Sequence, residues 1–226
     1  MDIISGSWSS MAITGKLVVT VLMGMSIYSY AIMVDRGVAL YRARRHSADF
    51  AADAEERVQD VDQLLTCAEE YEQRGSCSLA AVVSAGLEEY KALRDDEQSD
   101  AVVVEGVDEG VSRALDVAVI NLRQRLTGMA TISGVAPFLG LFGTVTGLIA
   151  AFHSIKVTGS GGLDTVSGGI SEALVTTVIG LFVAIPALSA YNFFMNRIDV
   201  MTIELDNAAS RLVSRSVRRA LKTTAS

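Results

Sequence analysis

The chain is poor in the residues that build most catalytic and metal sites. Only two of its 226 residues are cysteine and only two are histidine. Cys67 and Cys77 lack metal-ligand spacing and a histidine companion, so neither a zinc site nor a disulfide scaffold is supported. No nucleophile–base set and no phosphate-binding glycine loop is present. We therefore predict no cofactor and no metal, and a hydrolytic enzyme has little support.

Basic charge is also scarce in the middle of the chain. The formal net charge is -7, and residues 36–128 alone carry 19 acidic and 11 basic side chains, a local charge of -8. Nucleic-acid binding needs a basic surface that can neutralise phosphates. Nucleic acid is therefore excluded as a partner of this block.

Hydrophobic residues are abundant and gathered in three runs. They make up 50% of the chain, and the mean hydropathy is +0.37, which favours a membrane protein. Three windows lack acidic and basic side chains, namely Leu17–Val34, Leu126–Ile155 and Val175–Asn196. Each is long enough to cross a hydrocarbon core roughly 30 Å thick. The first lacks a basic leader and an Ala-x-Ala cleavage pattern, so we interpret it as a retained transmembrane helix.

The basic residues at the ends of the three runs predict the orientation of the chain. The flanks after run one, before run two and after run three hold twelve Lys and Arg residues, whereas the opposite flanks offer only Lys16 and Lys156. By the positive-inside rule, the N-terminus lies outside, and the middle block and C-terminal tail lie in the cytoplasm. Lys156–Ser167 then lies outside.

The middle block has the periodicity of helices. Ala51–Arg74 has apolar residues near a 3.6-residue period, and Leu79–Leu93 forms a second short amphipathic helix. A charged turn, Arg94–Asp100, follows. From about Val102 the pattern continues helically into run two, although Val102–Val104 could instead form a short strand.

These patterns predict an all-α integral membrane protein with three transmembrane helices, long cytoplasmic extensions and a helical cytoplasmic domain. We expect six segments: a periplasmic N-terminus with helix one (1–35), the cytoplasmic domain (36–128), helix two (129–156), a periplasmic loop (157–168), helix three (169–196) and a cytoplasmic tail (197–226).

Two of the apolar helices have one side made of small and polar residues. On a helical wheel of helix three, an arc of roughly 140° contains Glu172, Gly169, Ala173, Thr176, Thr177, Gly180, Ala184 and Ala187. On helix two, an arc of roughly 120° contains Ser133, Ala136, Gly140, Gly143, Thr144, Gly147, Ala151 and Ser154. Bulky apolar residues lie opposite both arcs. Val183, Leu139 and Thr146 are exceptions to this division.

Close helix packing is one interpretation of these faces. Small residues let helix backbones approach, and Gly143-x-x-x-Gly147 is a common contact motif in membranes. Each threonine hydroxyl can bond back to its own helix. Pro137 and Pro186 can kink or loosen their helices, or mark only irregular packing.

Glu172 is less easily explained by packing. An ionised carboxylate inside a membrane span costs on the order of 3 kcal/mol or more on insertion scales, although its place near the outer end of helix three softens that cost. It is the only acid within the two polar-faced helices. We therefore interpret Glu172 as a functional candidate, whereas His153, alone near the end of helix two, fits a structural role better.

Two sequence stretches resemble a known family. Residues 130–147, ATISGVAPFLGLFGTVTG, and residues 169–187, GISEALVTTVIGLFVAIPA, look like the MotA/TolQ/ExbB proton-channel family on its TolQ/ExbB side. The motifs cover roughly residues 113–196, and the three-span layout extends the resemblance to the whole chain. A flagellar stator is disfavoured, because that branch has four spans.

The resemblance implies a bacterial inner-membrane homopentamer around the transmembrane helices of two TolR/ExbD-like subunits. Protons would pass by way of an aspartate on that partner. The family's channel threonines fall on Thr144 and Thr177, and its glutamate falls on Glu172. Three positions depart from the family pattern: Ser171 precedes the glutamate, Thr146 stands where Trp is frequent, and Thr176 stands where Ala is common, so either Thr176 or Thr177 can carry the channel role.

The residues themselves agree with this implied role. No carboxylate lies deep in the three spans, so the chain needs a partner's acid to carry protons at mid-membrane. Hydroxyl groups can both donate and accept hydrogen bonds, and so can solvate such an acid. We therefore expect a Ton- or Tol-type energy-transducing subunit, which a TonB/TolA-like protein could also contact. A gliding-motility motor of the same family and a non-conducting scaffold remain alternatives, as does Na⁺ in place of H⁺.

Overall fold

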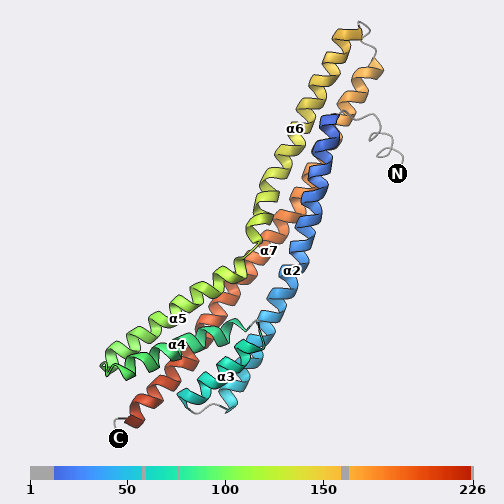
Figure 1. Cartoon of the computed structure of the whole chain (residues 1–226). Coiled ribbons are helices and arrows are strands. Elements are labelled where there is room, and N and C mark those ends of the chain that lie inside the picture. Colours follow the sequence, from blue (N-terminus) through green and yellow to red (C-terminus); the bar gives the residue numbers. More distant parts are fainter. Residues whose placement is uncertain (1–12, 58–59, 76, 159–162, 225–226) are drawn as a thin grey trace. The chain divides into compact units, whose positions relative to one another are not determined.

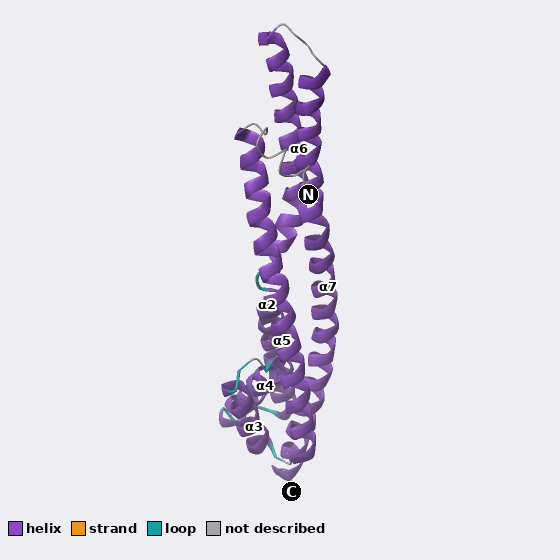
Figure 2. Ribbon diagram, turned by 90° about the vertical axis from the view of Figure 1, so that its right-hand side faces the viewer, coloured by secondary structure: helices purple, strands orange, loops and turns teal. Residues whose placement is uncertain are grey.

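The computed structural model describes residues 13–57, 60–75, 77–158 and 163–224. Within these ranges, the side chains of residues 57, 154, 157–158, 163–167, 172 and 223–224 lie outside the description. The described residues form helices and no strand (Figure 2). In chain order, labelled as in Figure 1, the helices are α2 (Ile13–Arg57), α3 (Val61–Gln73), α4 (Ser78–Asp95), α5 (Asp100–Arg123), α6 (Leu126–Thr158) and α7 (Leu163–Thr224).

Contacts divide the chain into two compact units. The first unit contains Met1–Val34 and Arg125–Phe193, and the second contains Asp35–Gln124 and Phe194–Ser226. The long helices α2 and α7 are each divided between the units, with one part in the first unit and the other part in the second. The described part of the predicted tail, residues 197–224, therefore belongs to the same unit as the helices of the middle block.

The first unit consists of the three apolar helices. Three candidate membrane spans lie within α2, α6 and α7, at Ile13–Glu56, Leu126–His153 and Gly168–Lys222, respectively. The prediction of three apolar helices long enough to cross a membrane is confirmed. Their common core contains Val18 and Leu22 of α2, Ile132 and Ala136 of α6, and Val183, Ala184 and Ala187 of α7.

The core accounts for two of the residues that did not fit the helical wheels. Val183, an exception on the wheel of helix three, is only 5% exposed, because it joins this core with α2. Leu139, an exception on helix two, also packs against the core. Pro137 and Pro186 lie inside α6 and α7 without ending either helix.

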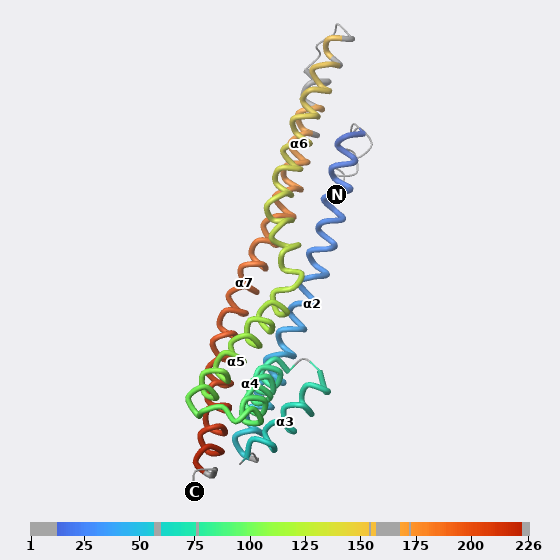
Figure 3. The backbone as a smooth tube through the Cα atoms, turned by 60° about the vertical axis from the view of Figure 1, so that its left-hand side comes forward, coloured from blue at the N-terminus to red at the C-terminus, as the bar shows by residue number. Residues whose placement is uncertain are grey.

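The second unit is built around an α4–α5 hairpin (Figure 3). Its core consists of fully buried apolar side chains from several helices, including Phe50 of α2, Leu64 of α3, Leu87 of α4, Val103 of α5, and Ile198 and Val213 of α7. The predicted helix at Leu79–Leu93 is confirmed as α4, and Val102–Val104 lies in helix α5 rather than in a strand.

The expectation of one helix over Ala51–Arg74 was wrong. Helix α2 ends at Arg57, and α3 begins at Val61 after a new N-cap. The cap residue Asp60 has an extended backbone and accepts a hydrogen bond from the Val61 N–H at 2.7 Å. The apolar period continues across this break, so periodicity alone did not reveal it.

The helical pattern that runs from about Val102 into helix two is also interrupted. Helix α5 ends at Arg123 and α6 starts at Leu126, with Arg125 at a φ of 66° between them. A left-handed backbone at a non-glycine residue interrupts a helix at a cost of roughly 1–2 kcal/mol. No proline or glycine marks this position, which is why the continuous pattern predicted an unbroken helix.

Candidate functional site

Helices α6 and α7 run side by side (Figure 1). They meet along a seam of glycines. A Cβ placed on Gly140 would lie 2.9 Å from the Thr176 carbonyl oxygen and 3.0 Å from the Thr177 Cα. A Cβ on Gly180 would lie 2.7 Å from the Ala136 carbonyl oxygen. Real Cβ atoms do not approach backbone so closely. The absence of side chains at Gly140 and Gly180 is therefore what lets the two backbones touch.

The seam continues in an antiparallel register. Gly147 lies opposite Ala173, with a built Cβ 3.2 Å from the Ala173 Cβ, and Gly169 lies opposite Ala151. The small-residue faces that the wheels predicted therefore face each other. For the glycines and alanines, the packing interpretation accounts for the pattern.

Thr176 lies inside this seam. It is 1% exposed, and its Oγ1 donates to the Ala173 carbonyl at 2.7 Å and to the Gly140 carbonyl on α6 at 3.2 Å. A Cβ on Gly143 would lie 2.6 Å from this Oγ1. The threonine side chain thus fills the space that Gly143 leaves open.

Thr177 is in a different environment from its neighbour. The residue is partly exposed, but its Oγ1 is buried and has no hydrogen-bond partner among the described residues. Threonines in helices usually bond back to a carbonyl one turn earlier. Thr144 does so, because its Oγ1 donates to the Leu141 carbonyl at 2.7 Å. Thr177 is therefore a buried hydroxyl with its hydrogen-bonding capacity unused.

Comparison with known sequences matches this region to one family. A family model described as the MotA/TolQ/ExbB proton channel family matches residues 77–207, more than half of the chain. The chain belongs to this family.

Individual members support the assignment over most of the length. The chain is 35% identical over 206 residues to a Tol-Pal system protein TolQ of Pseudomonas aeruginosa, covering 85% of this chain and 83% of the relative. It is 34% identical over 201 residues to a biopolymer transport protein ExbB of Neisseria meningitidis, covering 83% and 85%. A shorter match of 47% over 90 residues, 40% of this chain and 36% of the relative, is to an ExbB of Xanthomonas campestris. The similarity therefore lies on the TolQ/ExbB side of the MotA/TolQ/ExbB family.

The other predicted site residues of this family member lie in the same two helices. Glu172 is part of α7, one turn before Thr176, but its side chain lies outside the described residues. Thr146 donates to the carbonyls of Phe142 and Gly143 within its own helix, at 2.9 and 3.1 Å. The structure thus brings Gly140, Gly143, Gly147, Gly180 and Thr176 into one seam, with Thr177 at its side.

Bulky apolar side chains cover the outward faces of α6 and α7. Phe138 is 71% exposed and Phe182 is 70% exposed, and further exposed side chains are Leu141, Phe142, Ile149, Leu174, Val178 and Ile185. In a membrane, such faces contact lipid tails or apolar faces of other chains. They are consistent with a member of a membrane-embedded family.

Sequence reasoning missed Ser29 of α2. This serine is 2% exposed, and its Oγ has no hydrogen-bond partner among the described residues. A serine in an apolar run carries no periodic signal by itself, so the sequence offered no reason to select it. Nearby, Tyr28 packs over Gly128, where a Cβ would lie 3.1 Å from the ring.

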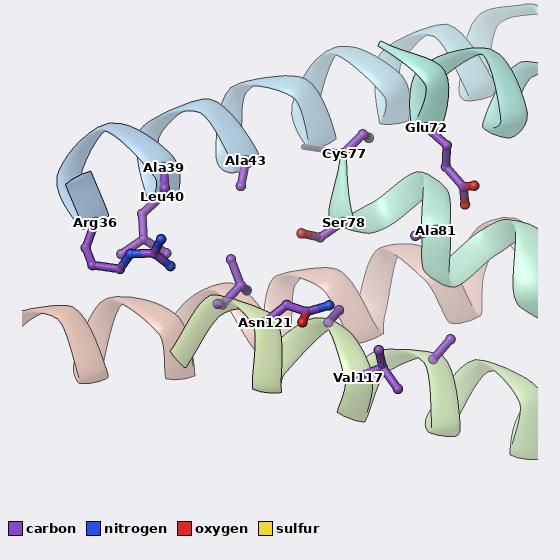
Figure 4. Close-up of a pocket in the computed structure, with 13 residues that line it drawn as sticks. Arg36, Ala39, Leu40, Ala43, Glu72, Cys77, Ser78, Ala81, Val117 and Asn121 are labelled. Atoms are coloured by element: carbon purple, nitrogen blue, oxygen red, sulfur yellow. The ribbon is translucent and has the colours of Figure 1, made fainter. Parts of the chain in front are cut away.

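The second unit has a separate hollow of about 580 Å³ (Figure 4). Small side chains such as Ala43 and Ala81 form much of its wall, and Arg36, Glu72 and Asn121 provide polar groups. Burial raises the pKa of the Cys77 thiol, which lines the same space. Within the described parts of the chain, no cluster of His, Cys, Asp and Glu could hold a metal ion. The hollow therefore offers no chemistry comparable to the unused hydroxyl in the first unit.

Proposed function

We propose that this chain is the proton-channel subunit of an inner-membrane motor that couples the proton motive force to work on the cell envelope. The single observation that carries the proposal is the buried Thr177 Oγ1, which lacks a partner among the described residues. Buried polar groups are almost always satisfied, so one that is not calls for an explanation. A transiently bound water, or an acid from another chain, would satisfy it.

The chain's own chemistry supports a partner that supplies the acid. Glu172 is the only carboxylate in the sequence of helices two and three, and it lies near the end of its span. A hydroxyl can donate to a carboxylate and accept from a carboxylic acid. Thr177 and Thr144 can therefore accommodate both protonation states of a partner's aspartate without adding fixed charge.

The proposed assembly follows from family membership. Five copies of the chain would surround two copies of a TolR/ExbD-like single-span protein, with the N-terminus in the periplasm and the C-terminus in the cytoplasm. The second unit would then be cytoplasmic. The exposed apolar faces of α6 and α7 support such an assembly, because they offer neighbouring copies a surface in the membrane. The similarity to TolQ and ExbB proteins, which covers 85% and 83% of this chain, supports Tol-Pal or Ton-type energy transduction.

Ion flux in liposomes tests the proposal. The chain is co-purified with the TolR/ExbD-like protein of the same genome and reconstituted with a pH-sensitive dye inside. A potassium diffusion potential then drives proton entry. We expect Thr177→Val to lower the flux per complex at least tenfold and Thr144→Val to lower it less, because the Thr144 hydroxyl proton already donates to the Leu141 carbonyl.

Thr131→Val provides the matched control, because Thr131 lies on α6, the helix that carries Thr144. The Thr131 Oγ1 donates to the Thr127 carbonyl at 2.9 Å on an exposed surface, away from the seam. The control should conduct like the unsubstituted protein. Unchanged flux in Thr177→Val, Thr144→Val and Glu172→Gln, with complexes intact, would leave a non-conducting scaffold as the function. If the flux instead follows a sodium gradient, the conducted ion is Na⁺ rather than H⁺.

A further inference from the structure

We infer that Thr176 is a positioning residue that locks the register of α6 against α7, and that it is not itself a member of the ion path. The inference rests on the proposed function only for its effect on ion flow. Its structural part concerns one interhelical hydrogen bond and one space in the seam. Both involve groups whose partners and distances are described.

We call the contact of Thr176 with Gly140 and Gly143 the lock. It combines a hydrogen bond with a close fit of the threonine side chain against a glycine. The Thr176 Oγ1 donates across the seam to the Gly140 carbonyl at 3.2 Å while also donating to the Ala173 carbonyl at 2.7 Å. Its Cβ and Cγ2 would lie 2.8 and 3.2 Å from a Cβ at Gly143. A slip of one residue along α6 would place a leucine or phenylalanine, Leu139, Leu141 or Phe142, where a glycine now lies. Such a slip would therefore replace the close glycine contact with a bulky side chain.

The same contacts leave the Thr176 hydroxyl outside the proposed ion path. Its single hydroxyl proton is engaged by two carbonyl oxygens, and the residue is 1% exposed. A hydroxyl that serves a moving proton must be able to change partners, as the unpartnered Thr177 Oγ1 can. The two adjacent residues on α7 therefore have different roles. Thr176 faces the seam, and Thr177 has a hydroxyl with no hydrogen-bond partner among the described residues.

The register matters because it sets the heights of two other threonines. Gly143 lies opposite Thr176 in the antiparallel pair. The next residues along each helix are Thr144 and Thr177, which lie on opposite sides of that level because the helices are antiparallel. The lock therefore fixes their offset along the helix axes at about two residue rises, roughly 3 Å, and a slip of one residue would change it by about 1.5 Å.

Three substitutions separate the roles. Thr176→Ser keeps the hydroxyl donor, Thr176→Val keeps the branched shape without a donor, and Thr177→Val removes the neighbouring hydroxyl. The register is reported by a disulfide in a Gly147→Cys, Ala173→Cys background. A Cβ at Gly147 lies 3.2 Å from the Ala173 Cβ, within a few tenths of an ångström of the range of about 3.5–4.5 Å that disulfides adopt.

The cross-linked fraction is measured by mass spectrometry after trypsin cleavage at Lys156, which lies between the two cysteines in the sequence. A single Gly147→Cys variant is the control for pairing with Cys67 or Cys77. We expect Thr176→Val to lower both the cross-linking rate and the proton flux per complex about fivefold, the factor for one lost neutral hydrogen bond. Thr176→Ser should restore both to within twofold. Thr177→Val should lower the flux and leave the cross-linking unchanged.

The outcomes distinguish this inference from the proposed function. Absence of proton flux in the unsubstituted complex would overturn the function, while slower cross-linking in Thr176→Val would still support the lock. Unchanged cross-linking in Thr176→Val would overturn the lock, whatever the flux. A loss of flux in Thr176→Val that is absent in Thr176→Ser, with normal cross-linking in both, would instead place the Thr176 hydroxyl in the path.

Discussion

In the first unit, α6 and α7 meet backbone to backbone at glycines, whereas buried side chains from several helices form the core of the second unit. The first contact depends on Gly140 and Gly180 and on the interhelical bond from Thr176. The second depends on side chains such as Leu64 and Leu87, which are at most 1% exposed. Apolar burial drives helices together in water, but lipid tails are as apolar as leucine. Between lipids, close approach and hydrogen bonding must replace that driving force.

Glycines show the difference most directly, because both units place them at helix contacts. In the second unit, a Cβ on Gly106 would meet the end of the Leu93 side chain, and one on Gly86 would meet methyl groups of Val111 and Val213. In the first unit, a Cβ on Gly140 would meet the backbone of α7. A side chain can change its rotamer, whereas a backbone in a helix cannot yield without moving the helix. Glycine is therefore required more strictly at Gly140, where it meets a backbone, than at Gly106, where it meets the end of a side chain.

Gly140→Val is expected to have the largest effect. Its Cβ would lie 2.9 Å from a carbonyl oxygen of α7, and its two methyl groups would reach further, so the helices must separate. Overpacking against side chains costs about 1–3 kcal/mol, but a clash with helix backbone has no rotamer change to relieve it and costs more. The Thr176 bond to Gly140 is lost as well. We expect no folded first unit, measured as loss of the Gly147→Cys, Ala173→Cys cross-link and as aggregation in mild detergent.

Gly134→Val is the matched control on the same helix. A Cβ at Gly134 meets nothing within 4 Å, so the substitution adds only an exposed apolar side chain to a membrane helix. It should cross-link and remain dispersed like the unsubstituted protein. Equal damage from both variants would mean that valine disturbs α6 itself, and the backbone contact would lose its special importance.

Leu87→Ala tests the side-chain contact in the second unit and should have an intermediate effect. Leu87 is 0% exposed, and the substitution leaves a cavity among side chains that relax only in part. Such changes cost about 2–5 kcal/mol. In a Cys67→Ser background, a thiol reagent should label Cys77, which is 5% exposed, at least tenfold faster, because the second unit opens more often.

Val117→Ala is the control, since Val117 is 58% exposed on α5 of the same unit. Its labelling rate should remain within about twofold of the parent. If Leu87→Ala also left Cys77 protected, side-chain burial would not be what holds this unit, and the contrast between the two units would fail.

The sequence predicted the faces of the helices better than their ends. Small residues at helical spacing identified the seam, because a contact between two helices must repeat with the helical period. The ends at Arg57 and Arg123 were missed, since the apolar period continues across both breaks and neither has a proline or glycine. Such breaks are set by packing in three dimensions.

The sequence also left the roles of Thr176 and Thr177 open. Adjacent residues on a helix differ by about 100° in direction, and the predicted polar arc was wide enough to hold both. Only the position of α6 distinguishes them: one hydroxyl reaches the Gly140 carbonyl, and the other has no partner among the described residues. A helical wheel of one chain segment does not contain the neighbouring helix that makes this distinction.

The last and smallest difference between the units concerns their side-chain hydrogen bonds. The Thr176 hydroxyl bonds to carbonyls, which do not titrate. In the second unit, the Tyr71 hydroxyl donates to the Asp53 carboxylate at 2.6 Å, and the ring packs edge-on against Phe50. The hydrogen bond to Asp53, followed by burial, raises the pKa of Tyr71 to about 12. Alkaline pH should therefore weaken the second unit through this bond.

Tyr71→Phe should lower the stability of the second unit by about 1 kcal/mol at pH 8. Below pH 10, tyrosine is protonated in both the folded and the unfolded chain, and the bond contributes fully. Between pH 10 and about 12, the unfolded tyrosine ionises while Tyr71 keeps its proton, so the contribution falls, and above that range it is lost. Urea midpoints from circular dichroism should therefore differ between parent and Tyr71→Phe at pH 8 and converge near pH 12. Tyr41→Phe, at an exposed position of the same unit, should match the parent throughout. Equal midpoints of the parent and Tyr71→Phe at pH 8 would show that the ring packing, which phenylalanine keeps, supplies the stability rather than the hydroxyl.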